Sequence, residues 1–147
     1  MQHQPPTYDP RYLAGIVLFN AGDFFEAHEV WEDVWMEATG AERKFYQGLI
    51  QAAVGLLHFG NGNLRGALKL YGSSRGYMID LPSPFYGLNV PAFLEAMTRC
   101  FQDLLAQDAT ALAGALDESL LPVMDLEPPP PSWPDREDFV ERDAASP

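Results

Sequence analysis

The residues most capable of chemistry lie between positions 28 and 58, on two segments whose apolar spacing predicts helices. His28 and Glu32 are four residues apart, so they stand one helical turn apart on the same face. Gln47, Gln51 and His58 follow on the next segment, at spacings of four and seven residues. A buried polar side chain costs about 1–3 kcal/mol unless it is hydrogen-bonded. We therefore expect the two helices to face each other through one shared polar network.

Three functions are compatible with this cluster, besides a purely structural role as a hydrogen-bonded part of the core. His28, Glu32 and His58 offer two imidazoles and a carboxylate to a metal ion, but the paired Glu-x-x-His motifs of di-iron bundles are missing. A histidine and a carboxylate also form the usual pair for general acid–base catalysis, but no convincing nucleophile accompanies this one. The third alternative is a pocket for a small polar ligand or a partner's side chain. We expect no bound metal and no cofactor.

Neighbouring polar and aromatic residues have simpler explanations. Glu26 completes a capping box with Asp23 at the start of the second helix. Glu29 belongs to the solvated face of that helix, and Trp31 is expected in the core. Asn63 ends a tight turn and is placed to cap the helix that follows.

The elements that must position these residues are all predicted to be helices. Apolar stripes, helix caps at Asp9 and Asn89, and glycines at Gly22 and in the turn 60–63 place them roughly at residues 10–22, 23–40, 41–59, 64–79, 89–104 and 108–120. The third is apolar nearly all round, which is typical of a central helix. Strand-like alternation is not apparent, and short connections favour antiparallel neighbours. The sequence therefore predicts an all-α, compact antiparallel bundle of five to six helices, in which Gly66, Gly72 and Gly76 allow close helix packing.

A chain of 147 residues fits one folded domain. We expect the helical domain to occupy residues 1–124 and a proline-rich acidic tail, too polar to pack and disordered, to occupy residues 125–147. Cys100 is the single cysteine, so no intrachain disulfide can form. The N-terminal residues lack the basic and apolar parts of a signal peptide, and no apolar run reaches the ~20 residues of a membrane span. These features predict a cytoplasmic protein.

The net charge of −12 restricts the partners. Nucleic-acid binding requires lysines and arginines that neutralise phosphates, and no basic patch is apparent in the sequence. Anionic membrane surfaces are disfavoured for the same reason. We therefore expect neither nucleic acid nor a membrane as a partner.

The run from Phe19 to Tyr71 resembles the signature of a bacterial and archaeal family called domain of unknown function 309. The resemblance rests on the segments FNAGDFFEAHEVWE, FYQGLIQAAVGLLH and GNLRGA, and a later PFYGLN resembles the family's loop before its next helix. It extends over roughly residues 12–107, with Asn89 where the family pattern has Asp. The family implies a compact helical bundle without an established activity. The positions that match it are Glu26, His28, Glu29, Trp31, Glu32, Gln47, Gln51, His58 and Asn63.

From the sequence we therefore expect a small helical binding or interaction domain. Its polar cluster is expected to line a partly buried pocket between the second and third helices. The alternative is a metal-dependent or acid–base enzyme that uses His28, Glu32 and His58. We expect a mixed outcome for the cluster, in which Gln51→Leu clearly destabilises the domain, whereas Glu32→Gln is nearly neutral or slightly stabilising. The ligand, the oligomeric state and the role of the acidic tail are left open by the sequence.

Overall fold

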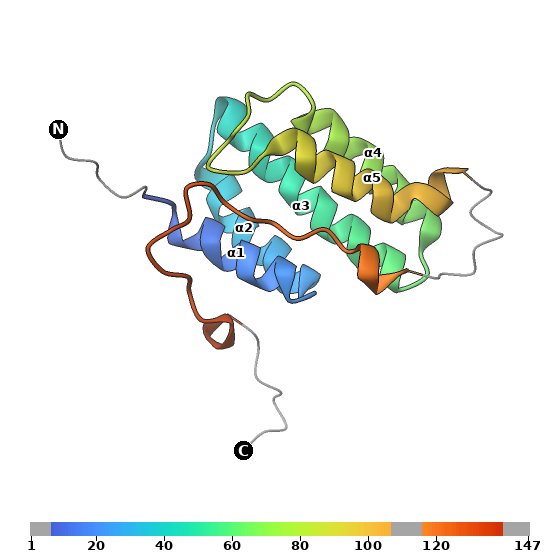
Figure 1. The fold of residues 1–147 in the computed structure, drawn as a ribbon, viewed down its shortest axis with the longest axis horizontal. Helices are drawn as coiled ribbons and strands as arrows, with labels where there is room; N and C mark the ends of the chain where they lie inside the picture. The colour runs from blue at the N-terminus through green and yellow to red at the C-terminus, as the bar shows by residue number, and fades with distance from the viewer. Residues whose placement is uncertain (1–6, 107–115, 140–147) are drawn as a thin grey trace, which may run out of the picture.

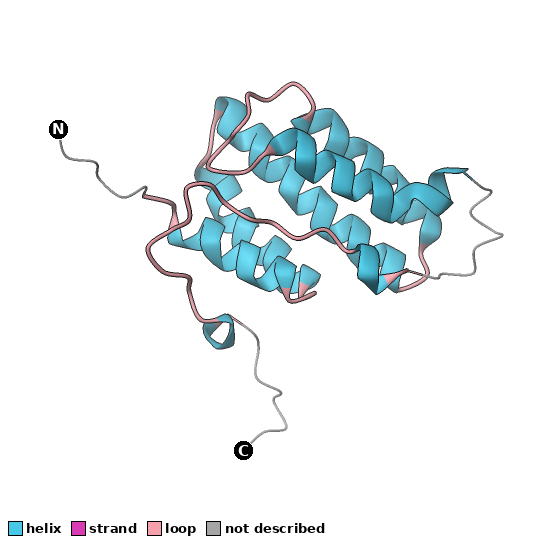
Figure 2. Ribbon diagram, viewed as in Figure 1, coloured by secondary structure: helices cyan, strands magenta, loops and turns pink. Residues whose placement is uncertain are grey.

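The computed structural model describes residues 7–106 and 116–139. Within these two ranges the regular structure is helical, and the β structure is limited to one isolated bridge, between Phe85 and Leu88 (Figure 2). The α-helices are α1 (Pro10–Asn20), α2 (Phe24–Glu37), α3 (Gly40–Gly60), α4 (Leu64–Met78) and α5 (Val90–Ala106). Two 3-10 turns follow, η2 (Glu118–Leu120) and η3 (Arg136–Asp138). The prediction of an all-α bundle is confirmed.

Helix α3 is the centre of the bundle. It packs against α2 on one side and α4 on the other, while α1 packs against α2 and α5 against α4 (Figure 1). Short turns reverse the chain after α1 and after α3. At both turns a glycine with positive φ, Gly22 at 84° and Gly62 at 81°, follows the helix end. The next amide donates back to a carbonyl of the last turn, from Asp23 to Leu18 and from Asn63 to His58, as in a Schellman motif.

Side-chain caps fix three of the helix starts. Asp9 accepts a hydrogen bond from the Arg11 amide, Asn63 from the Gly66 amide, and Asn89 from the Ala92 amide. These caps were predicted from the sequence. An added Cβ at Gly66 would lie 2.6 Å from the amide nitrogen of Asn63, so this glycine makes room for the cap.

The predicted capping box at Asp23 is wrong, because the Asp23 side chain makes no capping bond. Its carboxylate instead pairs with the guanidinium of Arg136 at 2.5 Å. A charge-assisted bond to arginine is stronger than a bond to a neutral amide, which is a physical reason for the exchange. The role assigned to Glu26 in that capping box is lost with it.

The glycines that permit close helix packing differ from the predicted ones. Added Cβ atoms at Gly72 and Gly76 would meet nothing within 4 Å, so the prediction is wrong for both. Both positions face outward from α4 and are exposed. The tight contacts are instead at Gly15 against Trp31 and at Gly48 against Met78.

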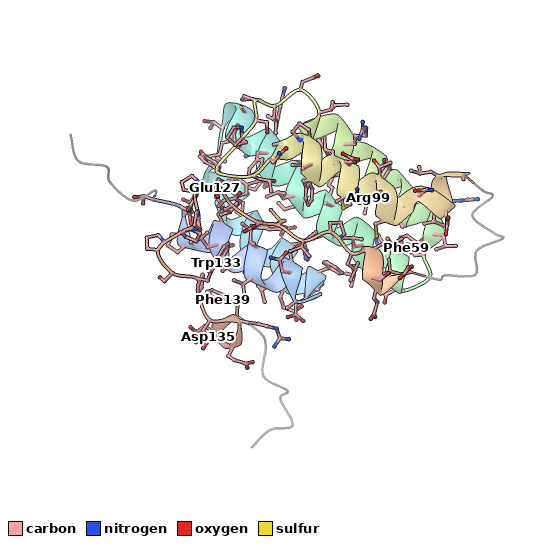
Figure 3. All side chains as sticks on the ribbon, in the orientation of Figure 1. Phe59, Arg99, Glu127, Trp133, Asp135 and Phe139 are labelled. Atoms are coloured by element: carbon pink, nitrogen blue, oxygen red, sulfur yellow. The ribbon has the colours of Figure 1, made fainter. Side chains whose placement is uncertain are left out.

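Residues 116–139 run in an extended path across the helices, and Figure 3 shows Glu127 and Trp133 on the same side of the molecule as α1. Met124 and Leu126 are each 2% exposed, whereas Val123 is 71% exposed. An extended chain turns successive side chains to opposite sides, so this alternation buries every second residue. The Asn20 amide fixes the path, because it bonds both the Met124 oxygen (2.9 Å) and the Met124 nitrogen (2.8 Å).

The expected disordered tail began at residue 125, but the structure packs its first part, including Leu126, on the bundle. The reason is the apolar alternation just described. The division of the chain at residue 124 stays a prediction, and residues 140–147 lie outside the described residues. Most of the sixth predicted helix, 108–120, also lies outside them, and its described end is the 3-10 turn η2.

Candidate functional site

The predicted pair on α2 is present. The Nε2 atom of His28 lies 3.5 Å from Oε1 of Glu32, with 17% of the histidine side chain and 51% of the glutamate side chain exposed. The Nδ1 atom of His28 lies 2.5 Å from the backbone oxygen of Phe25, one turn earlier. Both ring nitrogens therefore face oxygen acceptors. The imidazole can donate to both only when it carries both protons.

The predicted polar row on α3 is half-buried. At about 100° per residue, Gln47, Gln51 and His58 fall within about 40° of one another on the helix. Gly48 and Gly55 lie on an adjacent face and approach α4, at Met78 and Leu70 respectively. The row therefore follows the face of α3 that its packed neighbours leave partly open.

Gln51 carries the most unusual atom of the row. Among the side chains of the described residues, its Oε1 stands alone in being buried without a hydrogen-bond partner. Native structures satisfy the large majority of their buried polar side-chain atoms. An exception on the most central helix is a reason to look for a ligand or a partner that supplies the donor.

His58 and Asn63 close the α3 end of the row. The Asn63 amide nitrogen lies 3.4 Å from Nδ1 of His58, while the amide oxygen caps α4 through Gly66. If the amide donates to Nδ1, the imidazole proton sits on Nε2. Asn63 thus orients the His58 ring and caps a helix at once.

The remaining predicted positions do not join this cluster. Glu26 lies two residues before His28, so it projects about 160° away around α2. Trp31 is fully buried, and its indole nitrogen donates to the backbone oxygen of Tyr12 at 3.2 Å, so it locks α1 to α2. Glu29 is exposed.

The two halves of the cluster are not directly connected. No hydrogen bond among the described residues joins His28 or Glu32 to Gln47 or Gln51, so the shared network is not formed by direct bonds. Within residues 7–106 and 116–139, no three His, Cys, Asp or Glu side chains lie close enough to share a metal ion. His58 is therefore not grouped with the α2 pair.

This architecture defines a small all-α domain with a half-buried polar row on its central helix. The family described as domain of unknown function (DUF309) matches residues 12–70, a stretch that contains all nine candidate residues. The chain belongs to this family, as its sequence motifs indicated. None of its described helices is both long and apolar enough to cross a bilayer.

Its relatives are described without an activity. An uncharacterised protein of Aquifex aeolicus (strain VF5) is 37% identical over 81 residues, which cover 52% of this chain and 24% of the relative. The uncharacterised protein YpuF of Bacillus subtilis (strain 168) is 39% identical over 69 residues, which cover 46% of this chain and 40% of the relative. The chain therefore spans less than half the length of either curated relative.

A solved structure supports the fold. The crystal structure of a conserved hypothetical protein from Thermus thermophilus matches with a TM-score of 0.55 at 30% sequence identity. The match covers 65% of this chain and 96% of that chain. The helical bundle is thus shared almost over the full length of the Thermus protein.

Proposed function

We propose that this domain is a binding module whose half-buried row on α3 accepts a hydrogen-bond donor from a small polar ligand or a partner's side chain. The observation that carries the proposal is the buried Oε1 of Gln51, which has no partner among the described residues. A stranded acceptor of this kind costs about 1–3 kcal/mol. A functional site commonly tolerates such a loss of stability because its geometry serves a ligand.

The flanking groups suit such a ligand. Gln47 stands one turn from Gln51 and offers both a donor and an acceptor. His58, held by Asn63, adds an imidazole at the far end of the row. The two glutamine amides carry no charge, so the row favours a polar, hydrogen-bonding occupant over a strongly charged one.

The enzyme alternative draws its support from the contact between His28 and Glu32. Two of its possible nucleophiles, Ser74 and Cys100, are unsuited to the role. The Ser74 hydroxyl is already committed to the backbone oxygen of Gly48 at 2.7 Å. Burial raises the pKa of the Cys100 thiol to about 11, so its reactive thiolate is suppressed at neutral pH. Binding is therefore the better-supported function.

The net charge of −12 further supports a partner other than nucleic acid, and the single buried thiol supports a cytoplasmic location. The partner other than nucleic acid and the cytoplasmic location are both parts of this proposal.

A titration of isotope-labelled protein with simple hydrogen-bond donors tests the binding function. Acetamide, N-methylacetamide and methanol, which are neutral, would each be added while the side-chain amide signals of Gln51 and of the exposed Gln102 are followed by NMR. We expect at least one donor to shift the Gln51 signal saturably and to raise the melting temperature. The matched variant Gln51→Met should lose the increase in melting temperature. If Gln51 and Gln102 respond alike to every donor, the proposal is refuted.

A further inference from the structure

Four tyrosines from separate parts of the chain meet around a cavity of about 180 Å³ near the start of α1. Neighbouring ring centroids are 5.9–6.4 Å apart, and their planes meet at 36–86°. The rings therefore form the walls of a cage instead of a stack. At about 30 Å³ per water, the cavity has the volume of roughly six water molecules. The four are Tyr8, Tyr12, Tyr46 and Tyr86.

The charge around the cage is negative. Asp9 and Glu42 line the cavity, and the guanidinium of Arg11 bonds both Asp9 (2.9 Å) and Glu37 (2.6 Å). Hydrogen bonding to Arg11 lowers the pKa of Asp9 and that of Glu37, so both remain ionised at neutral pH. The region therefore holds three carboxylates and one guanidinium. Arg43, the next cation along α3, is turned away, because it stacks 3.7 Å from the centroid of the Trp35 ring.

Three of the tyrosine hydroxyls are already bonded. Tyr12 donates to the backbone oxygen of Tyr86 at 3.0 Å, Tyr8 donates to the backbone oxygen of Pro128 at 2.6 Å, and Tyr86 donates to the Glu42 carboxylate. Tyr46 is different. The residue as a whole is only 2% exposed and lines the cavity, and its hydroxyl makes no hydrogen bond to another described residue. Unlike the Oε1 of Gln51, the hydroxyl oxygen itself still reaches the solvent. Burial, reinforced by the carboxylates of Asp9 and Glu42, raises the pKa of Tyr46 and keeps this hydroxyl neutral.

The backbone at Tyr86 gives an independent indication of a site. Tyr86 has φ 45° and Gly87 has φ 78°, in a two-residue turn that backbone hydrogen bonds of 2.9 Å close between Phe85 and Leu88. Such turns favour Asn-Gly, and a bulky side chain in the left-handed region is strained. The turn itself does not need a tyrosine. The side chain of Tyr86, which is 41% exposed, instead supplies the outer wall of the cage and donates a hydrogen bond to Glu42. Strain of this kind concentrates at functional sites.

We propose that this cage binds a protonated alkylamine. The ammonium group rests against the tyrosine faces, as cations do in aromatic cages, and donates N–H bonds to the Glu42 carboxylate and the Tyr46 hydroxyl. The carboxylates supply the charge complement, and Tyr86 retains the ammonium from the solvent side. This site shares no residue with the α3 row, so the proposal is independent of the binding function proposed above and is tested separately.

The test compares n-butylammonium chloride with the neutral 1-butanol, at matched ionic strength, by following the backbone amide signals of Tyr46, Tyr86 and Gly87. We expect saturable binding of the ammonium, with an affinity about tenfold higher than that of the alcohol. Glu42→Gln should weaken ammonium binding by about tenfold, and Tyr46→Phe should weaken it several-fold. Tetramethylammonium has no N–H, so Tyr46→Phe should leave its binding unchanged.

Tyr77→Leu is the matched control, because Tyr77 is 39% exposed on α4 and is not among the residues that line the cage. It should bind n-butylammonium as the unmodified chain does. Equal affinity for 1-butanol, an unchanged affinity in Glu42→Gln, or no saturable shift up to about 100 mM ammonium would each overturn the proposal. Both test variants are close isosteres, and a melting curve of each verifies that it is folded.

Discussion

Two helix glycines of this chain have opposite surroundings. A Cβ at Gly15 would lie 1.9 Å from the indole nitrogen of Trp31, whereas a Cβ at Gly72 would meet nothing within 4 Å. Trp31 is fully buried and bonded to the Tyr12 oxygen, so it cannot retreat. We expect Gly15→Ala to cost about 3 kcal/mol of unfolding free energy through overpacking. Gly72→Ala should gain about 0.5–1 kcal/mol from better helix propensity.

Urea denaturation of both variants measures the difference between them. The two substitutions are chemically identical, so they change helix propensity by a similar amount and differ mainly in packing. Equal free energies of unfolding would show that the close contact between α1 and α2 does not exist in solution.

At the residue scale, local relations were predictable and distant ones were not. The spacing of His28 and Glu32 predicted their contact because a helix sets it without help from the rest of the fold. The half exposure of Glu32 fits the expectation that Glu32→Gln is nearly neutral. Asp23 was expected to cap its helix, but its partner is Arg136, 113 positions later, which no local pattern reveals. The partnerless oxygen of Gln51 likewise depends on neighbours that only the tertiary structure supplies.

At the scale of elements, Asp9 fixes the start of α1 in two ways. Its Oδ1 accepts the Arg11 amide at 2.8 Å, and its Oδ2 pairs with the Arg11 guanidinium at 2.9 Å. We expect Asp9→Ala to lose about 1–2 kcal/mol, because both interactions disappear. Asp9→Asn should lose less, because asparagine also caps helices. Chemical denaturation at neutral pH distinguishes the two substitutions, and equal losses would contradict the capping role.

The same pair predicts a pH dependence. Hydrogen bonding to Arg11 lowers the pKa of Asp9 in the folded state. As a result, Asp9 becomes protonated at a lower pH in the folded state than in the unfolded state. The contribution of Asp9 to the free energy of unfolding is complete above its pKa in the unfolded state, which is about 3.9. This contribution is lost as pH falls through the lowered pKa of the folded state. The stability difference between the unmodified chain and Asp9→Asn should therefore be constant near neutral pH and shrink below about pH 4.

The C-terminal segment, residues 116–139, is held on the bundle because every second side chain near Leu126 is buried against the helices. Leu126 is 2% exposed and Val123 is 71% exposed, three positions apart on the same extended segment. Leu126→Ala should destabilise the protein by about 2–3 kcal/mol, whereas Val123→Ala should stay within about 0.5 kcal/mol. Thermal melting of the two variants measures this directly. If Leu126→Ala melts like Val123→Ala, the segment is not docked in solution.

The helices were predictable because their signals are local and repeated. The Asp9 cap, the turn glycines at positions 22 and 62, and the apolar stripes placed all five described helices. The docked segment was missed because only a few alternating apolar residues mark it, beside a proline run typical of unpacked chain. The tyrosine cage was missed because its four rings come from separate parts of the chain. They belong to the segment before α1, to α1, to α3 and to the loop before α5. A sequence does not show that such distant residues meet.

For the whole molecule, folding and binding make competing demands on the central helix. Domain stability is commonly only about 5–15 kcal/mol, so one stranded polar group is a noticeable part of it. Helix α3 packs against α2 and α4 along most of its length but keeps a half-buried polar row along one face. We propose that this row is kept for a ligand and that the fold would be more stable without it.

The measurement that tests this claim most directly is the unfolding free energy of Gln51→Met. The sequence suggested that an apolar substitution at Gln51 destabilises the core, but the partnerless Oε1 reverses that expectation. Methionine keeps the length of glutamine and its helix propensity, while it removes the stranded acceptor. We predict a gain of about 1 kcal/mol for Gln51→Met and a smaller change for Gln47→Met. A loss of about 1–3 kcal/mol for Gln51→Met would mean that Gln51 is satisfied within the fold, and it would contradict the binding role.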